Sequence, residues 1–165
     1  MKKLLAACAI LILYISCNSD KNNARETAEA ITKTVEQTRP GAVATSDAGW
    51  TLKAVIDGKA WSASAMMPPA DIGRIIGYYK DEYMGLPFGK EHMKKGATYT
   101  LGDEESAEYF APGSQEQWGT GMGELLVTYA DEAKIEGSFH FTQKSKTSGR
   151  ELKVTDGFFR IPLEK

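Results

Sequence analysis

Apolar and polar residues alternate along the last part of the chain, and this pattern predicts two long β-strands. Between residues 134 and 142 every second position is apolar or glycine, which is the two-residue period of a strand with one buried face. A polar loop at 143–150 follows, and the alternation resumes at residues 151–163. It changes phase at Asp156-Gly157. One extra residue at a glycine predicts a β-bulge there. We expect the other strands to pack around these two long strands.

A second alternating run predicts a β-hairpin. Residues 50–56 alternate, Asp57-Gly58 follows, and a shorter run begins at Lys59. Asp-Gly between two such runs is a strong hairpin signal, because both central residues of a type I′ turn need positive φ. In this register Ala54 faces Trp61, so that Trp61 points into the core rather than toward a ligand.

Further strands are predicted at hairpin spacing. Pro87 suggests that the strand containing it lies at a sheet edge, and the segment from Met66 to Pro69 should interrupt the pairing. No helix is predicted after residue 48. About eight to ten short strands describe an all-β fold, either an antiparallel β-sandwich or a small β-barrel. The runs that complete this count are 72–79, 83–88, 97–102, 109–118 and 124–129.

Three tyrosines gather at one predicted turn. Tyr78, Tyr79 and Tyr83 flank Lys80-Asp81-Glu82. Aromatic rings at a loop end can hold a sugar ring or a peptide, although a half-buried tyrosine is also an ordinary strand residue. We take these three residues as the candidate ligand patch.

Residues suited to catalysis or to metal binding are scarce. His92 and His140 are the two histidines, and no cysteine follows Cys17. The acids at 103–105 are consecutive, whereas calcium loops alternate ligands with spacers. No Gly-x-Ser-x-Gly elbow occurs. The sequence therefore predicts no catalytic residue, metal or cofactor, and the protein is not expected to be an enzyme.

The length and charge of the chain limit its size and partners. At 165 residues the chain can build one core, so we expect a single β domain at 49–165. Its formal net charge of −2 falls to −4 when Lys2 and Lys3 leave with an export segment. Proteins that bind nucleic acid need an excess of basic residues, so nucleic acid is not an expected partner.

The N-terminus has the features of an export signal with a lipid anchor. Two lysines precede twelve apolar residues, a run too short to cross a membrane, so residues 1–16 are read as a signal peptide. The end of this run, Tyr14-Ile15-Ser16-Cys17, resembles the lipobox of bacterial lipoproteins. That resemblance implies cleavage before Cys17 and its acylation by chains such as palmitate, which anchor a protein stably in a membrane. Asn18 after the cysteine resembles the signal for outer-membrane sorting, on either the periplasmic or the outer face.

Residues 17–48 are read as the lipidated cysteine and a flexible, partly helical tether, because large apolar side chains are rare there. The domain that follows resembles a set of uncharacterised Bacteroidota lipoproteins. They share an N/D-G-x-x-W opening, a G-T-Y-x-L-G middle and a G-T/S-F-x-F … V-T-x-G-x-F ending. This resemblance implies an all-β lipoprotein domain and no known activity. The matching segments are 55–63, 97–102, 123–128, 135–141 and 154–159.

Three functional hypotheses remain. The leading one is a non-enzymatic binding module for an envelope protein or a glycan. The second is a calycin-like barrel that carries a small apolar ligand in a pocket lined by aromatic residues. The third, a hydrolase, would need two carboxylates facing each other across a cleft. The aromatic residues considered for the barrel pocket are Trp50, Trp61, Phe139, Phe141 and Phe159.

Overall fold

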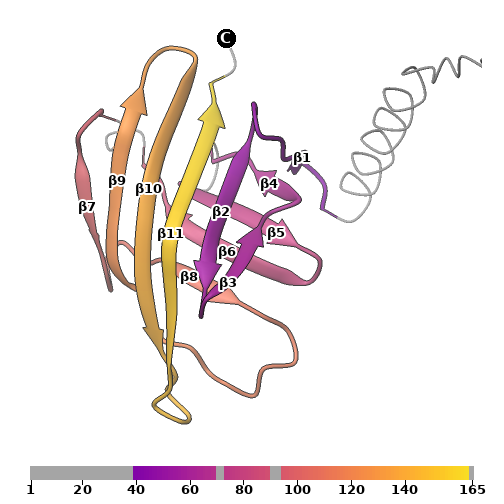
Figure 1. Cartoon of the computed structure of the whole chain (residues 1–165), viewed down its shortest axis with the longest axis vertical. Helices are drawn as coiled ribbons and strands as arrows, with labels where there is room; N and C mark the ends of the chain where they lie inside the picture. Colours follow the sequence, from indigo (N-terminus) through magenta and orange to yellow (C-terminus); the bar gives the residue numbers. More distant parts are fainter. Residues whose placement is uncertain (1–38, 70–72, 90–93, 164–165) are drawn as a thin grey trace, which may run out of the picture.

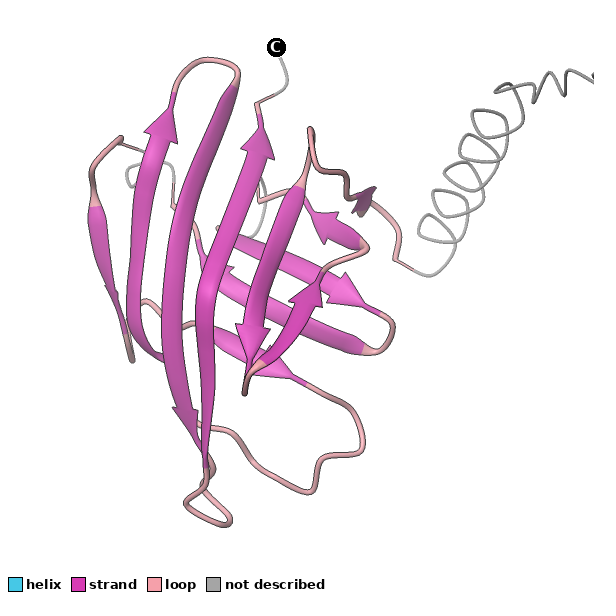
Figure 2. Ribbon diagram, in the orientation of Figure 1, coloured by secondary structure: helices cyan, strands magenta, loops and turns pink. Residues whose placement is uncertain are grey.

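The computed structural model describes residues 39–69, 73–89 and 94–163, and every helix or strand assigned within them is a β-strand. The strands form two antiparallel sheets that pack against each other and do not close into a barrel (Figure 2). Of the two predicted all-β architectures, the β-sandwich is therefore correct. The strands of the two sheets run in crossing directions, as Figure 1 shows.

The larger sheet has six strands, with the two longest at its centre. Its register shifts between Thr155 and Phe158, and Asp156 has a φ of 50°, which confirms the predicted bulge. The predicted hairpin is also present, since Asp57 and Gly58 both have positive φ. In order across the sheet the strands are β3 (Lys59–Ser62), β2 (Thr51–Ile56), β11 (Glu151–Pro162), β10 (Lys134–Lys144), β9 (Met122–Ala130) and β7 (Thr98–Leu101).

The smaller sheet has five strands, and it contains a strand that the sequence pattern missed. We expected the segment beginning at Met66 to interrupt pairing, but the residues before Pro68 pair with β5. The order across this sheet is β1 (Val43–Ala44), β4 (Ala65–Met67), β5 (Arg74–Tyr79), β6 (Glu82–Pro87) and β8 (Glu108–Phe110).

The prediction that Pro87 marks an edge strand is wrong, because β6 lies between β5 and β8. The amide of Phe88 donates to the carbonyl of Gly73 on the β5 side. Since successive amides of a strand point in opposite directions, the nitrogen of Pro87 points to the β8 side. There the pairing with β8 has already ended at Gly85. The missing donor therefore costs no hydrogen bond in the sheet.

Apolar side chains from both sheets fill the space between them. Phe88 of the smaller sheet meets Phe159 of the larger one edge to face, with ring centroids 6.2 Å apart. The aromatic residues proposed for a barrel pocket belong to this core instead. Four of them are buried in its main cluster and the fifth packs against it: Trp61, Phe139, Phe141, Phe159 and Trp50.

The described part of the chain before Trp50 lies against the smaller sheet. Val43 and Ala44 pair with β4, and Ala42 is buried against Ala65. The guanidinium of Arg39 lies 4.5 Å from the centre of the Tyr78 ring. Contacts with the sandwich thus begin within residues 17–48, the range read as a tether. The signal peptide, Cys17 and His92 lie outside the described residues.

Candidate functional site

Three aromatic residues form a continuous row across the outer face of the smaller sheet. Tyr78 of β5 pairs directly with Tyr83 of β6, and Tyr83 pairs directly with Phe110 of β8. Directly paired residues of antiparallel strands point to the same face. We call Tyr78, Tyr83 and Phe110 the aromatic row. Tyr79, the third tyrosine of the predicted patch, pairs with Glu82 and points to the opposite face.

Phe110 is the most exposed member of the aromatic row. Its ring stacks on that of Tyr83 with centroids 5.3 Å apart and an angle of 23° between the planes. Even so, 45% of Phe110 remains exposed to solvent. At the other end of the row, Arg39 covers Tyr78. The open part of the row therefore lies at Phe110, which a ligand could cover with a gain of buried apolar area.

A salt bridge lies beside the aromatic row on the same face of the smaller sheet. Arg74 Nη2 donates to Glu108 Oε1 at 3.0 Å, and Nη1 donates to the hydroxyl of Ser106 at 3.1 Å. The guanidinium reaches Glu108 across Gly85, where an added Cβ would lie 2.9 Å from Arg74 Nη2. Burial, followed by the nearby carboxylate of Glu108, raises the pKa of Tyr83.

A cavity of about 480 Å³ adjoins the aromatic row. It lies between β8 and residues 111–121, which we call the cavity loop; Figure 1 shows this loop leaving β8 beyond the end of the sandwich. Its volume falls within the range of small-molecule sites. Four of the thirteen described residues that line it are aromatic: Tyr83, Ser106, Ala107, Glu108, Tyr109, Phe110, Glu116, Gln117, Trp118, Gly119, Thr120, Gln143 and Lys146.

The cavity loop is fastened to the tip of the β10–β11 hairpin. Glu116 accepts hydrogen bonds from the hydroxyls of Ser145 and Ser148. These bonds hold the pKa of Glu116 below its usual value. The guanidinium of Arg150 lies 5.2 Å from the centre of a ring of Trp118. Because several contacts hold the loop, the cavity is formed without a ligand.

Three polar side chains that line the cavity make no polar contact with the rest of the described chain. Within the described part of the chain, the side chains of Gln117, Thr120 and Lys146 make no hydrogen bond or ion pair. The amide and the hydroxyl can each donate and accept, and the ammonium can donate. The cavity therefore offers free polar groups next to an aromatic surface.

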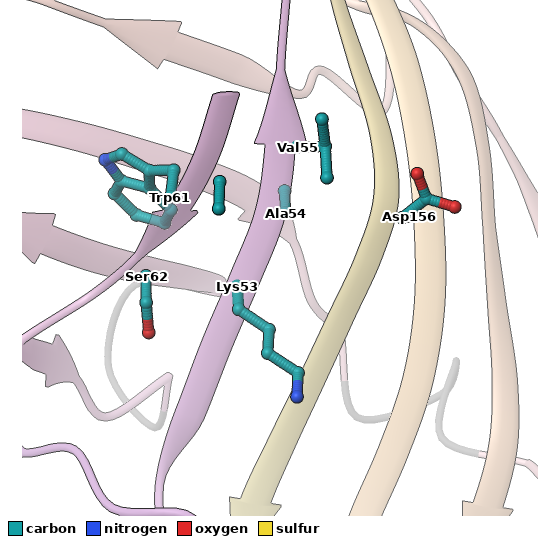
Figure 3. A pocket seen from close by; sticks show the side chains of 7 residues that line it. Lys53, Ala54, Val55, Trp61, Ser62 and Asp156 are labelled. Atoms are coloured by element: carbon teal, nitrogen blue, oxygen red, sulfur yellow. The ribbon is translucent and has the colours of Figure 1, made fainter. Parts of the chain in front are cut away.

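A second hollow, of about 330 Å³, lies on the outer face of β2 and β3 (Figure 3). Lys53 reaches from β2 toward β11 there, and its Nζ lies 5.4 Å from the centre of the Phe158 ring. Trp61 is turned into the sandwich, where its Nε1 donates to Glu82 Oε2 at 2.8 Å. This hollow lacks an open aromatic surface, so the cavity beside Phe110 is the better candidate. Its lining consists of Lys53, Ala54, Val55, Ala60, Trp61, Ser62 and Asp156.

Neither a metal-binding cluster nor a membrane-spanning helix occurs among the described residues. Among them, no three His, Cys, Asp or Glu side chains converge on a point where a metal could bind. The same residues contain no helix long and apolar enough to cross a membrane. His140 lies on the exposed face of β10, the face that its position in the alternating pattern predicts.

The fold and the site together define an antiparallel β-sandwich with an aromatic row on one outer face and a polar cavity beside it at the β8 edge. A family model described as "Domain of unknown function (DUF6252)" matches residues 50–162. The chain belongs to this family, which confirms the prediction of an uncharacterised domain family. Comparisons with curated proteins and with solved structures found no match.

Proposed function

We propose that the protein is a cell-envelope lipoprotein whose β-sandwich is a non-catalytic binding module for an envelope glycan or protein. The observation that carries this proposal is the aromatic row, which ends in the exposed ring of Phe110 beside a cavity formed in advance. A preformed site of this volume with aromatic walls is typical of ligand binding. The tyrosines of the predicted patch contribute Tyr78 and Tyr83 to this surface.

The carboxylates at the cavity favour binding over hydrolysis. Glu108 is paired with Arg74, and Glu116 accepts bonds from serine hydroxyls that lower its pKa. Glycoside hydrolysis needs one carboxylic acid that stays protonated, which requires a raised pKa. Glu116 instead accepts hydrogen bonds that favour its charged form, and Glu108 is held in a salt bridge with Arg74. The calycin-like alternative has less support, because the sheets do not close into a barrel.

The envelope location rests on the sequence. Cys17 follows a short apolar run and a small residue, and the domain resembles Bacteroidota lipoproteins. Acyl chains on Cys17 would anchor the module in the outer membrane. Growth of expressing cells with an alkyne-tagged palmitate should label the wild-type chain, and Cys17→Ser should abolish labelling. Equal labelling of both chains would refute lipidation at Cys17.

The binding role is tested by photo-crosslinking of the full chain in isolated envelopes. A benzophenone amino acid is placed at position 110, and the matched control carries it at Tyr129. Tyr129 is 37% exposed and lies on the other sheet, in β9. We expect a discrete adduct, with glycan or protein, only from position 110. Absence of any adduct at 110, or the same adducts from both positions, would refute a binding role for the aromatic row.

A further inference from the structure

We infer that the ligand of the cavity beside Phe110 is a neutral carbohydrate, with one sugar ring on Phe110 and its hydroxyls among Gln117, Thr120 and Glu116. This inference rests on the proposed binding function and names the ligand class. It follows from four features: the aromatic surface, the free polar groups, the charges of the lining and the state of the β8 edge.

The aromatic surface suits a ligand that has an apolar face and a polar rim. The exposed part of Phe110 is a flat hydrocarbon surface, and its position is fixed by stacking on Tyr83. A pyranose ring presents C–H groups on one face and hydroxyls around its edge, so it can cover the phenyl ring while its hydroxyls stay hydrogen-bonded. Because Arg39 covers Tyr78 at the far end of the row, the open surface for this sugar ring lies at Phe110.

The free polar groups match hydroxyls, because a hydroxyl both donates and accepts. Gln117 and Thr120 line the cavity and can do the same, and their side chains are uncommitted among the described residues. Glu116, ionised and fixed by serine hydroxyls, can only accept. A purely apolar ligand would leave these groups without partners, which is costly once water is excluded.

The charges of the lining select neither an anionic nor a cationic ligand. Two carboxylates, Glu108 and Glu116, line the cavity with a single cation, Lys146, among the described lining residues. Glu108 already has Arg74 as its partner, so one negative group, Glu116, and one positive group, Lys146, remain, and the lining has no net charge that would select an ionic ligand. The aromatic faces are also partly covered by cations of the chain itself, since Arg150 lies over Trp118. Neither charge class of ligand is favoured over a neutral one.

The edge of β8 is closed to the addition of a peptide strand. The outward-pointing amide of Tyr109 already donates to Gln143 Oε1 at 2.9 Å. The carbonyl of Ala107 accepts from the amide of Gly121 at 2.8 Å. A peptide that docks as an extra strand needs such groups to be free. The backbone at this site is therefore occupied, and recognition must come from side chains.

The experiment uses the purified full chain on an array of neutral and anionic oligosaccharides, followed by calorimetric titration with the strongest neutral one. We expect binding that changes little with salt, because no ion pair forms. Phe110→Ala should weaken it about tenfold or more, and Gln117→Ala should weaken it severalfold. Tyr129→Ala, the matched exposed-aromatic control, should leave it within about twofold.

Phe110→Tyr keeps the ring and should retain binding, which separates loss of stacking from misfolding. Binding of anionic oligosaccharides alone, lost in Phe110→Ala, would overturn the neutral class. Absence of glycan binding together with a specific protein adduct from position 110 would overturn the carbohydrate inference and leave the binding module standing. Absence of both would overturn the inference and the proposed function together.

Discussion

Gln143 supplies the hydrogen-bond partner of the Tyr109 amide, with 2.9 Å between Gln143 Oε1 and the backbone nitrogen. The other end of the same side chain donates from Nε2 to the carbonyl of Gly119 at 3.0 Å. Gln143 is only 2% exposed. One buried amide therefore joins the central strand β10 to β8 and to the cavity loop, and it forms part of the cavity lining.

Replacing this amide should loosen both segments. Gln143→Leu has a similar volume but leaves the Tyr109 amide and the Gly119 carbonyl without partners. We expect the free energy of unfolding to fall by about 2–4 kcal/mol. Urea denaturation measures this, and Gln117→Leu, at an exposed position of the cavity loop, is the matched control with little effect. A loss below about 0.5 kcal/mol in Gln143→Leu would mean that water replaces the side chain.

Gly123 allows the backbones of β9 and β10 to approach closely. A Cβ at this position would overlap the carbonyl oxygen of His140 and crowd the Cα of Phe141. Because backbone atoms cannot move aside, Gly123→Ala should destabilise the protein by about 3 kcal/mol or more. At Gly102 the same change meets only the end of the Met122 side chain, at 3.6 Å, and should cost far less. Similar unfolding midpoints for the two variants would contradict this explanation.

The features that the sequence predicted correctly are encoded over short distances. The Asp57-Gly58 turn needs only two residues with positive φ, and both have it. The bulge at Asp156 was visible because the alternation of apolar positions changes phase there. In both cases the backbone conformation is determined by residues that are neighbours in the sequence, so the local sequence pattern is enough to predict it.

The features that it missed depend on contacts between distant segments. Phe110 completes the aromatic row only because β8 pairs with β6, which no local pattern specifies. Gln143 was assigned to a polar loop, but the cavity loop passes over it and buries it. Gly121 and Gly123 are also explained by distant segments, because they lie against the backbones of Ala107 and His140. A polar or glycine-rich segment does not reveal which distant backbone will cover it.

Protonation of Glu116 should release the cavity loop in acid. Hydrogen bonds from Ser145 and, to a smaller extent, Ser148 hold the pKa of this carboxyl below its usual 4.5 in the folded state. The stability that it contributes is therefore present above about pH 4.5 and is lost as the pH falls through the lower folded value. In Glu116→Gln this part of the pH dependence should vanish.

The measurement is the urea midpoint between pH 7 and about pH 3 for the wild type, Glu116→Gln and the exposed-carboxylate control Glu151→Gln. Asp131 and Glu136, whose pKa values are also lowered, titrate in all three proteins. The difference between curves therefore isolates Glu116. Parallel curves for the wild type and Glu116→Gln would show that its serine contacts do not favour the charged form.

The exposed ring of Phe110 should contribute little to folding. Its main contact within the fold is the stack on Tyr83, so Phe110→Thr should cost only about 0.5–1.5 kcal/mol. Phe141, at 1% exposure, is the buried comparison, and Phe141→Ala should cost about 3–5 kcal/mol. Urea denaturation of both variants measures the contrast. A loss in Phe110→Thr as large as that in Phe141→Ala would make Phe110 a structural residue and remove the main argument for a ligand. A small loss would show that the fold does not need the exposed phenyl ring of Phe110. Its position beside a preformed cavity would then favour a role in binding.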